Sequence, residues 1–220
     1  MSKPHITNFT CPNCGQQFQI EQWNVINATE NPEASEKLLH GSLFHQTCPH
    51  CGKDLHVLYT CLYTNHDKKF VISLQPQRDQ PAATPLIPHY TMRLVHTLQD
   101  FVERARILDA GLDDMALEMM RMVLLAQIQK KFPDKNVTSL RFDSVQDDEI
   151  YFQIDPANPR DQIKIPMPYF WSMEDKLKDS GLRPDLAGYA VMNGNWVRQS
   201  GILNCLLPKK PEQPQENETD

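Results

Sequence analysis

The sequence has little of what membrane-spanning and secreted proteins need. In its most apolar stretch the longest unbroken apolar run covers only residues 122–126, whereas a membrane-spanning helix needs about 20 apolar residues. The segment before the first cysteine has no apolar core of the kind found in secretory signals. These absences exclude a membrane-spanning protein and predict one that stays in the cytoplasm.

Positive charge is also scarce. The 220 residues include 22 Lys and Arg against 28 Asp and Glu, which gives a formal net charge of -6, and no segment has a basic excess. Because binding to phosphate backbones depends on clustered Lys and Arg, nucleic acid is a disfavoured partner. The rest of the composition, 40% hydrophobic and 23% charged, is typical of one or two globular domains.

The chemically informative feature is a pair of nearly identical C-P-x-C-G loops at residues 11–15 and 48–52. In such a loop the first thiolate comes from the end of a strand, and the glycine lets the backbone turn back out. Two loops that face each other supply four sulfurs in the tetrahedral arrangement that zinc prefers. We therefore predict a structural zinc site, with iron as an alternative metal for the same ligands. The predicted ligands are Cys11, Cys14, Cys48 and Cys51.

Redox catalysis is the competing interpretation of a C-P-x-C pair. A reactive cysteine of that kind lies at a helix N-terminus, where the dipole lowers the thiol pKa. Here glycine and an alternating strand pattern follow each pair, as at Phe18 and Ile20 after Gly15. Four thiolates would also fill the shell of a zinc ion and leave no open position for catalysis. The site is therefore predicted to be structural, and Cys11→Ser or Cys51→Ser to unfold the surrounding unit.

Other reactive side chains lack a supporting pattern. Cys61 and Cys205 are single thiols without an activating base nearby in sequence, and the acidic run 147–149 falls where a turn is expected. We interpret them as inert cysteines and a solvated turn. Five histidines crowd the first unit without a recognised ligand spacing, and we interpret them as exposed side chains: His40, His45, His50, His56 and His66.

Strand and helix signals organise the first half of the chain. Alternating apolar residues predict three strands, near residues 18–20, 55–59 and 70–74. Asn31 and Pro32 are suited to begin a short inserted helix, and Gly41 to end it. Four prolines within residues 75–88 are incompatible with a regular element and indicate a connector between two units.

Two helices are predicted after this connector. Apolar residues recur at spacings of three and four from Leu94 to Leu108, which predicts an amphipathic helix that Gly111 ends. A second helix, from about Leu112 to Phe132, is apolar on nearly every side and is expected to lie in a core. The short connection predicts an antiparallel helix pair. With the zinc-ribbon-like segment this pair forms a predicted unit over residues 1–132.

The sequence after residue 132 predicts a second unit, over residues 133–207. Its apolar period changes to two, which predicts a three-stranded antiparallel meander. A short helix from Ser172 to about Asp179 and a hairpin at Asn193-Gly194 are expected to follow. Residues 208–220 contain no large apolar side chain and predict a disordered tail. The predicted fold class is α+β.

The paired loops and their surroundings resemble the CpXC family of bacterial and archaeal proteins. Besides the four cysteines, the resemblance includes Trp23 to Asn27, Asn31-Pro32, Gly41 to Phe44 and Arg106 to Asp114. It covers roughly residues 6–130. It implies a zinc-ribbon-like module with the four cysteines as metal ligands, and it implies no particular activity.

Three hypotheses of function follow. The leading one is a zinc-stabilised, non-enzymatic protein that interacts with, or regulates, a protein partner. The first alternative is a nucleic-acid- or ribosome-associated protein, which requires one of two basic sets to converge on one face: Lys68, Lys69 and Arg78, or Arg104, Arg106 and Arg121. The second is an enzyme with a pocket between the helical pair and the C-terminal sheet. Its candidate lining, for which core packing is the favoured interpretation, is Tyr169, Trp171 and Trp196.

Overall fold

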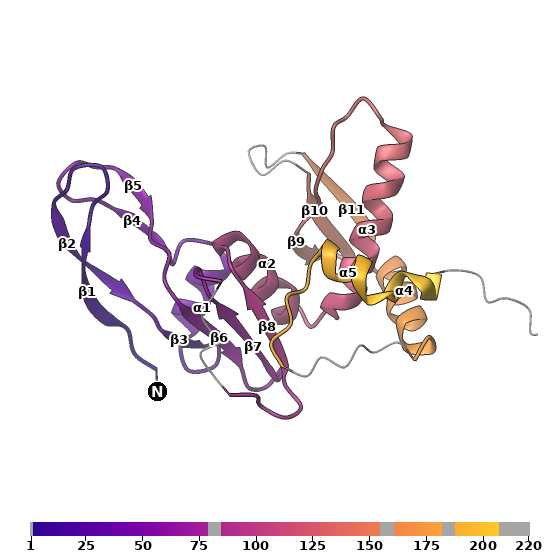
Figure 1. Cartoon of the computed structure of the whole chain (residues 1–220), viewed down its shortest axis with the longest axis horizontal. Helices are drawn as coiled ribbons and strands as arrows, with labels where there is room; N and C mark the ends of the chain where they lie inside the picture. The colour runs from indigo at the N-terminus through magenta and orange to yellow at the C-terminus, as the bar shows by residue number, and fades with distance from the viewer. Residues whose placement is uncertain (1, 79–84, 155–160, 182–187, 207–220) are drawn as a thin grey trace, which may run out of the picture.

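The chain folds as a mixed α+β protein (Figure 1), which confirms the predicted class. Its buried apolar side chains form two hydrophobic cores. The computed structural model describes residues 2–78, 85–154, 161–181 and 188–206. None of the described helices is long and apolar enough to cross a membrane. The first core includes Ile26, Leu38, Phe44, Tyr63, Ile72 and Phe101. The second core includes Leu117, Met119, Met120, Phe142, Phe152 and Phe170.

Two antiparallel hairpins form an arm that extends away from both cores (Figure 1). The first pairs β1 (His5–Thr10) with β2 (Gln17–Gln22), and the second pairs β4 (His45–Thr47) with β5 (Asp54–His56). We call residues 5–22 and 45–56 the arm. The predicted strand at Phe18 and Ile20 is confirmed as β2. No residue of the four strands belongs to either core among the described residues.

A four-stranded sheet carries the first core. Its order is β3-β6-β7-β8, with the outer pairs parallel and the central pair antiparallel. The strands are β3 (Val25–Asn27), β6 (Cys61–Asn65), β7 (Phe70–Leu74) and β8 (Thr91–Val95). Every residue of β6 and β7 is buried, so the alternating pattern at residues 70–74 marks a strand covered on both faces.

The helices of the first part differ from prediction at one boundary. The inserted helix α1 (Pro32–Leu39) begins after Asn31 as predicted, whereas α2 (Leu98–Asp109) begins four residues after the predicted start at Leu94. Leu94 lies in β8, and Thr97 is the N-cap because its side chain accepts a hydrogen bond from the Asp100 N–H.

The proline-rich segment 75–88 therefore connects two strands of one sheet and not two units.

The two helices contribute to different cores. The apolar face of α2 packs mainly in the first core, whereas α3 (Asp114–Lys131) supplies a large share of the second. This confirms the prediction that the Met-rich helix is a core helix. The helices meet each other through charged side chains, which are described below.

The second part is built on the predicted meander. Strands β9 (Arg141–Gln146), β10 (Glu149–Gln153) and β11 (Gln162–Pro166) pair antiparallel in the order β11-β10-β9. Asp147 and Asp148 both have positive φ, 50° and 59°, and form the two-residue turn between β9 and β10. Helix α4 (Met167–Asp179) starts five residues before the predicted Ser172 and ends before Gly181 as expected.

The predicted hairpin at Asn193-Gly194 is wrong. Asn193 is the N-cap of α5 (Gly194–Ser200), and its side chain accepts hydrogen bonds from the N–H groups of Asn195 and Trp196. An Asn-Gly pair therefore begins a helix here, because the side chain of Asn satisfies helix-terminal donors as readily as it permits a tight turn. A short 3₁₀ helix, η1 (Ile202–Leu206), follows. The predicted tail 208–220 lies outside the described residues.

Candidate functional site

The two C-P-x-C loops adopt the same backbone geometry at the end of the arm. In the first, the Cys11 N–H donates to the Gln16 carbonyl and the Gly15 N–H donates to the Cys11 carbonyl, both at 2.9 Å. In the second, the Cys48 N–H donates to Lys53 and the Gly52 N–H to Cys48, again at 2.9 Å. Gly15 and Gly52 have φ of 72° and 68°, a left-handed conformation that a side chain would strain. Repetition of this geometry brings two loops of one shape face to face.

The four predicted ligands come together in a single cluster. Their sulfur atoms all lie within 4.8 Å of one another. The Cys11–Cys51 and Cys14–Cys48 sulfur distances are both 3.8 Å, about the edge of a tetrahedron of sulfurs around an ion with metal–sulfur bonds near 2.3 Å. The cluster can therefore hold a metal ion with thiolate ligands.

Hydrogen bonds and the close approach of the four sulfurs shift the pKa values of Cys51 and Cys14 in opposite directions. The Lys53 N–H and the side-chain amide of Asn13, 3.5 Å from the Cys51 sulfur, lower the pKa of Cys51 to about 6. The Gln16 N–H lowers the pKa of Cys14, but desolvation and the three neighbouring sulfurs outweigh it and raise that pKa to about 12. Negative charge on one sulfur thus opposes ionisation of the others, and a bound cation would relieve the repulsion. Sequence analysis did not identify the hydrogen bond from Asn13 to Cys51, although Asn13 lies between two predicted ligands in the sequence.

The surroundings of the cysteine pairs do not match a redox active site. Strands β2 and β5 follow the two loops, so neither pair lies at a helix N-terminus, where a dipole would activate a thiol. Cys61 is fully buried in β6, and burial raises its pKa well above the ordinary value. It fits the prediction of an inert cysteine. The side chain of Cys205 lies outside the described part of the structure.

The five histidines do not gather at one site, and each contacts a nearby side chain or backbone group. The rings of His45 and His56 pack across the β4–β5 pair at 5.5 Å, and a His45 nitrogen lies 3.6 Å from an Asp54 oxygen. His40 contacts a backbone carbonyl, His50 contacts that of Gln17, and His66 contacts the Tyr90 hydroxyl. Within the described residues, the cysteine cluster is the only group of three or more such side chains arranged to hold a metal ion.

The acidic run 147–149 occupies a turn, as predicted. Asp147 and Asp148 form the β9–β10 turn, and Glu149 accepts a hydrogen bond from Lys164 at 2.8 Å.

The three arginines of the second basic set each bind acidic or backbone groups of the protein. Arg104 is 6% exposed and donates to Asp114 and Glu118, both at 2.9 Å. Arg121 donates to Glu103 at 2.7 Å. Arg106 donates to the Leu39 carbonyl and lies 3.5 Å from an Asp143 oxygen. This set therefore does not form a basic face.

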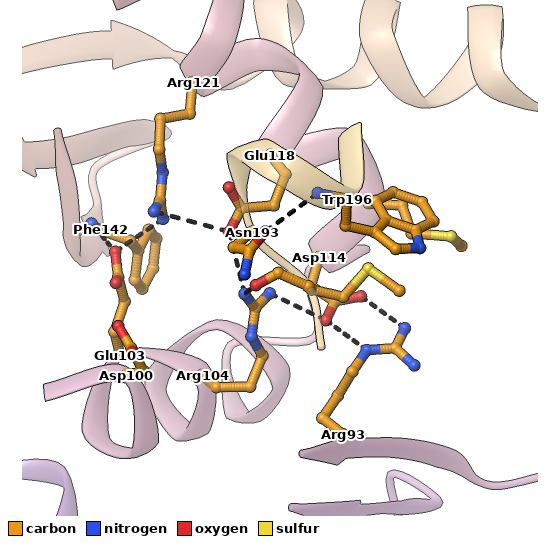
Figure 2. A network of polar contacts seen from close by, with 12 residues as sticks. Arg93, Asp100, Glu103, Arg104, Asp114, Glu118, Arg121, Phe142, Asn193 and Trp196 are labelled. Atoms are coloured by element: carbon orange, nitrogen blue, oxygen red, sulfur yellow. Dashed lines mark hydrogen bonds and ion pairs between the residues drawn. The ribbon is translucent and has the colours of Figure 1, made fainter. Parts of the chain in front are cut away.

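These contacts belong to a larger cluster at the junction of the two parts, which we call the ionic network (Figure 2). It joins four arginines to four carboxylates: Arg93, Arg104, Arg121 and Arg141 with Asp100, Glu103, Asp114 and Glu118. Asp114 lies at its centre, 2% exposed, and receives two bonds from Arg93 at 2.7 and 2.8 Å. Arg104 also donates to the Met192 carbonyl at 2.7 Å, which connects the network to the segment before α5.

Burial by itself would raise the pKa of Asp114, but the charges of Arg104 and Arg93 outweigh it and hold that pKa below the ordinary value. Sequence analysis did not identify this network. A signal was nevertheless present: Asp114, Glu118 and Arg121 recur at spacings of four and three in the part of the helix before Gln127, where the other residues are apolar. Charges on such a face indicate a buried polar network.

A cavity of about 330 Å³ adjoins the network, but the predicted aromatic residues do not line it. Tyr169 and Trp196 pack against the second core, and Trp171 is 48% exposed on α4. The lining comes instead from Arg78, the segment 94–97, helices α2 and α3, the segments 138–140 and 191–194, and Arg198.

Comparison with known proteins identifies the family of the chain. A model for the CpXC family, described as CpXC protein, matches residues 9–121, which include all four clustered cysteines. The chain belongs to the CpXC family. No curated protein and no solved structure matches it.

Proposed function

We propose that the four cysteines bind one zinc ion, and that the ion is structural. The proposal is supported by the four sulfurs within 4.8 Å, because zinc is bound in closed structural sites by four thiolates. Such a shell leaves no position for a substrate or an activated water. The reducing cytoplasm would keep the thiols available for metal.

We further propose that the chain is a non-enzymatic interaction or regulatory protein whose metal-stabilised arm contacts a protein partner. The observation that carries this proposal is the arm itself, which extends away from both cores and ends in the cysteine cluster (Figure 1). Its strands expose most of their side chains, including Ile6, which is 61% exposed. An ordered hairpin surface of this kind offers apolar and backbone groups to a partner without a catalytic centre.

Site-specific photocrosslinking in native cells tests the arm as a partner surface. A benzophenone side chain at Ile6 on β1 should capture one protein, and capture should be lost when a chelator removes the metal. The matched control places the same group at Trp171, the exposed aromatic residue on α4. Absence of a protein adduct at Ile6, an adduct to nucleic acid there, or equal capture of the same protein from Trp171 would contradict the proposal.

A further inference from the structure

The cavity beside the ionic network lies where the two parts of the protein meet. Its volume is about 330 Å³, within the range of small-molecule sites, about 300 to 1,000 Å³. Its lining includes five large apolar side chains, those of Leu94, Met122, Leu125, Leu140 and Met192, together with charged and polar groups. A lining that combines apolar side chains with a few polar groups is typical of a ligand site.

The charges around this cavity do not cancel. The ionic network is balanced, because four arginines face four carboxylates. Arg78 and Arg198 also line the cavity. Arg198 donates to the neutral side-chain oxygen of Asn195 at 2.8 Å, and neither arginine forms an ion pair with a carboxylate in the described part of the chain. The cavity lining as a whole contains four arginines and three carboxylates, so it has a formal surplus of one positive charge. Arg78 and Arg198 are the two lining arginines outside the ionic network.

One donor inside the cavity wall is unsatisfied. The Nε–H of Arg121 is buried and has no hydrogen-bond partner among the described residues, although the Nη2 of the same side chain donates to Glu103 at 2.7 Å. A buried donor without an acceptor is destabilising. Because this nitrogen has almost no accessible surface, a ligand oxygen would reach it only after the Arg121 side chain moves.

We propose that the cavity binds a small organic dianion, either a phosphate monoester or a dicarboxylate, with an apolar body. Arg78 and Arg198 would supply the compensating charge, since guanidinium groups bind both kinds of oxyanion through paired hydrogen bonds. The apolar body would lie against Met122 and Leu125. Binding would be independent of the metal-binding arm, because the cavity contains no residue of the arm.

Isothermal titration of the full-length, metal-loaded protein with phenyl phosphate and with phthalate tests this site. At least one of the two should bind with a submillimolar Kd, and benzyl alcohol, which has the ring without the charge, should not. Arg198→Gln and Arg78→Gln should each weaken binding by about tenfold or more, as expected for loss of a charge-assisted hydrogen bond. Binding of phenyl phosphate alone would identify a phosphate monoester, and binding of phthalate alone a dicarboxylate.

Lys130→Gln is the matched control. Lys130 is exposed on α3 and does not line the cavity, so this variant removes the same charge without changing the site, and its affinity should equal that of the wild type. Both arginines are exposed, and thermal unfolding should show that their variants remain folded. No saturable binding of either dianion, an equal loss in Lys130→Gln, or unchanged affinity in both arginine variants would overturn the proposal.

Discussion

Cys51→Ser should release the arm while the four-stranded sheet of the first part stays folded. Sequence analysis predicts loss of the whole unit, but the arm and the first core are separate in the structure. Two-stranded hairpins are marginally stable alone, whereas metal binding in small thiolate sites contributes on the order of 10 kcal/mol to folding. Amide hydrogen exchange should therefore become nearly unprotected over residues 5–22 and 45–56, and remain slow over β6 and β7.

His50→Gln is the control for this variant. His50 lies in the same loop, and its ring contacts the Gln17 carbonyl of the first hairpin at 3.2 Å. The change to Gln keeps all four sulfurs. Its arm should exchange almost as slowly as that of the wild type. An arm that stays protected in Cys51→Ser, or that loses equal protection in His50→Gln, would show that the metal site does not hold the arm together.

Asp114→Ala should lower the free energy of unfolding by about 3–5 kcal/mol, the usual cost of leaving buried charges without their partner. Arg93 and Arg104 are 3% and 6% exposed, and both donate to Asp114. Removal of the carboxylate would leave two guanidinium groups in a low-dielectric environment. Urea unfolding followed by fluorescence measures the difference.

Glu174→Gln provides the comparison, because it breaks the exposed Glu174–Lys178 pair on α4. Exposed pairs contribute at most about 1 kcal/mol, so this variant should unfold almost as the wild type does. If Asp114→Ala cost no more than Glu174→Gln, the ionic network would not stabilise the junction between the two parts.

The same carboxylate predicts how stability depends on pH. The folded-state pKa of Asp114 is held below its ordinary value, so its stabilising contribution is fully present above the pKa of the unfolded chain, about 3.9. The contribution is lost as the pH falls through the lower folded-state pKa. The difference in stability between wild type and Asp114→Ala should therefore be constant near neutral pH and shrink below about pH 4. A difference that grows in acid would contradict this assignment.

Local signals in the sequence predict the metal cluster and most elements well. The repeated C-P-x-C-G loops specify both the ligands and the turn geometry, because each glycine occupies a left-handed position that the loop requires. Helix ends at Gly41, Gly111 and Gly181 also follow from their positive φ. These features depend on a few neighbouring residues, which is why pattern alone is sufficient.

The prediction errors arise where contacts between distant residues determine the local conformation. Leu94 continues a helical spacing, yet β8 pairs with β7, and that pairing gives it a strand conformation. Asn193-Gly194 suits a turn, but Asn193 caps a helix. The ionic network joins residues from β8, α2, α3 and β9, and no local pattern brings Arg93 next to Asp114.

Metal analysis combined with X-ray absorption at the zinc edge tests the central claim most directly. For reduced protein purified from its native cells without added metal, we predict about one zinc per chain, bound by four sulfur ligands at about 2.3 Å. Less than about half an equivalent of metal, iron in place of zinc, or oxygen or nitrogen atoms in the first coordination shell would contradict a structural four-thiolate zinc site.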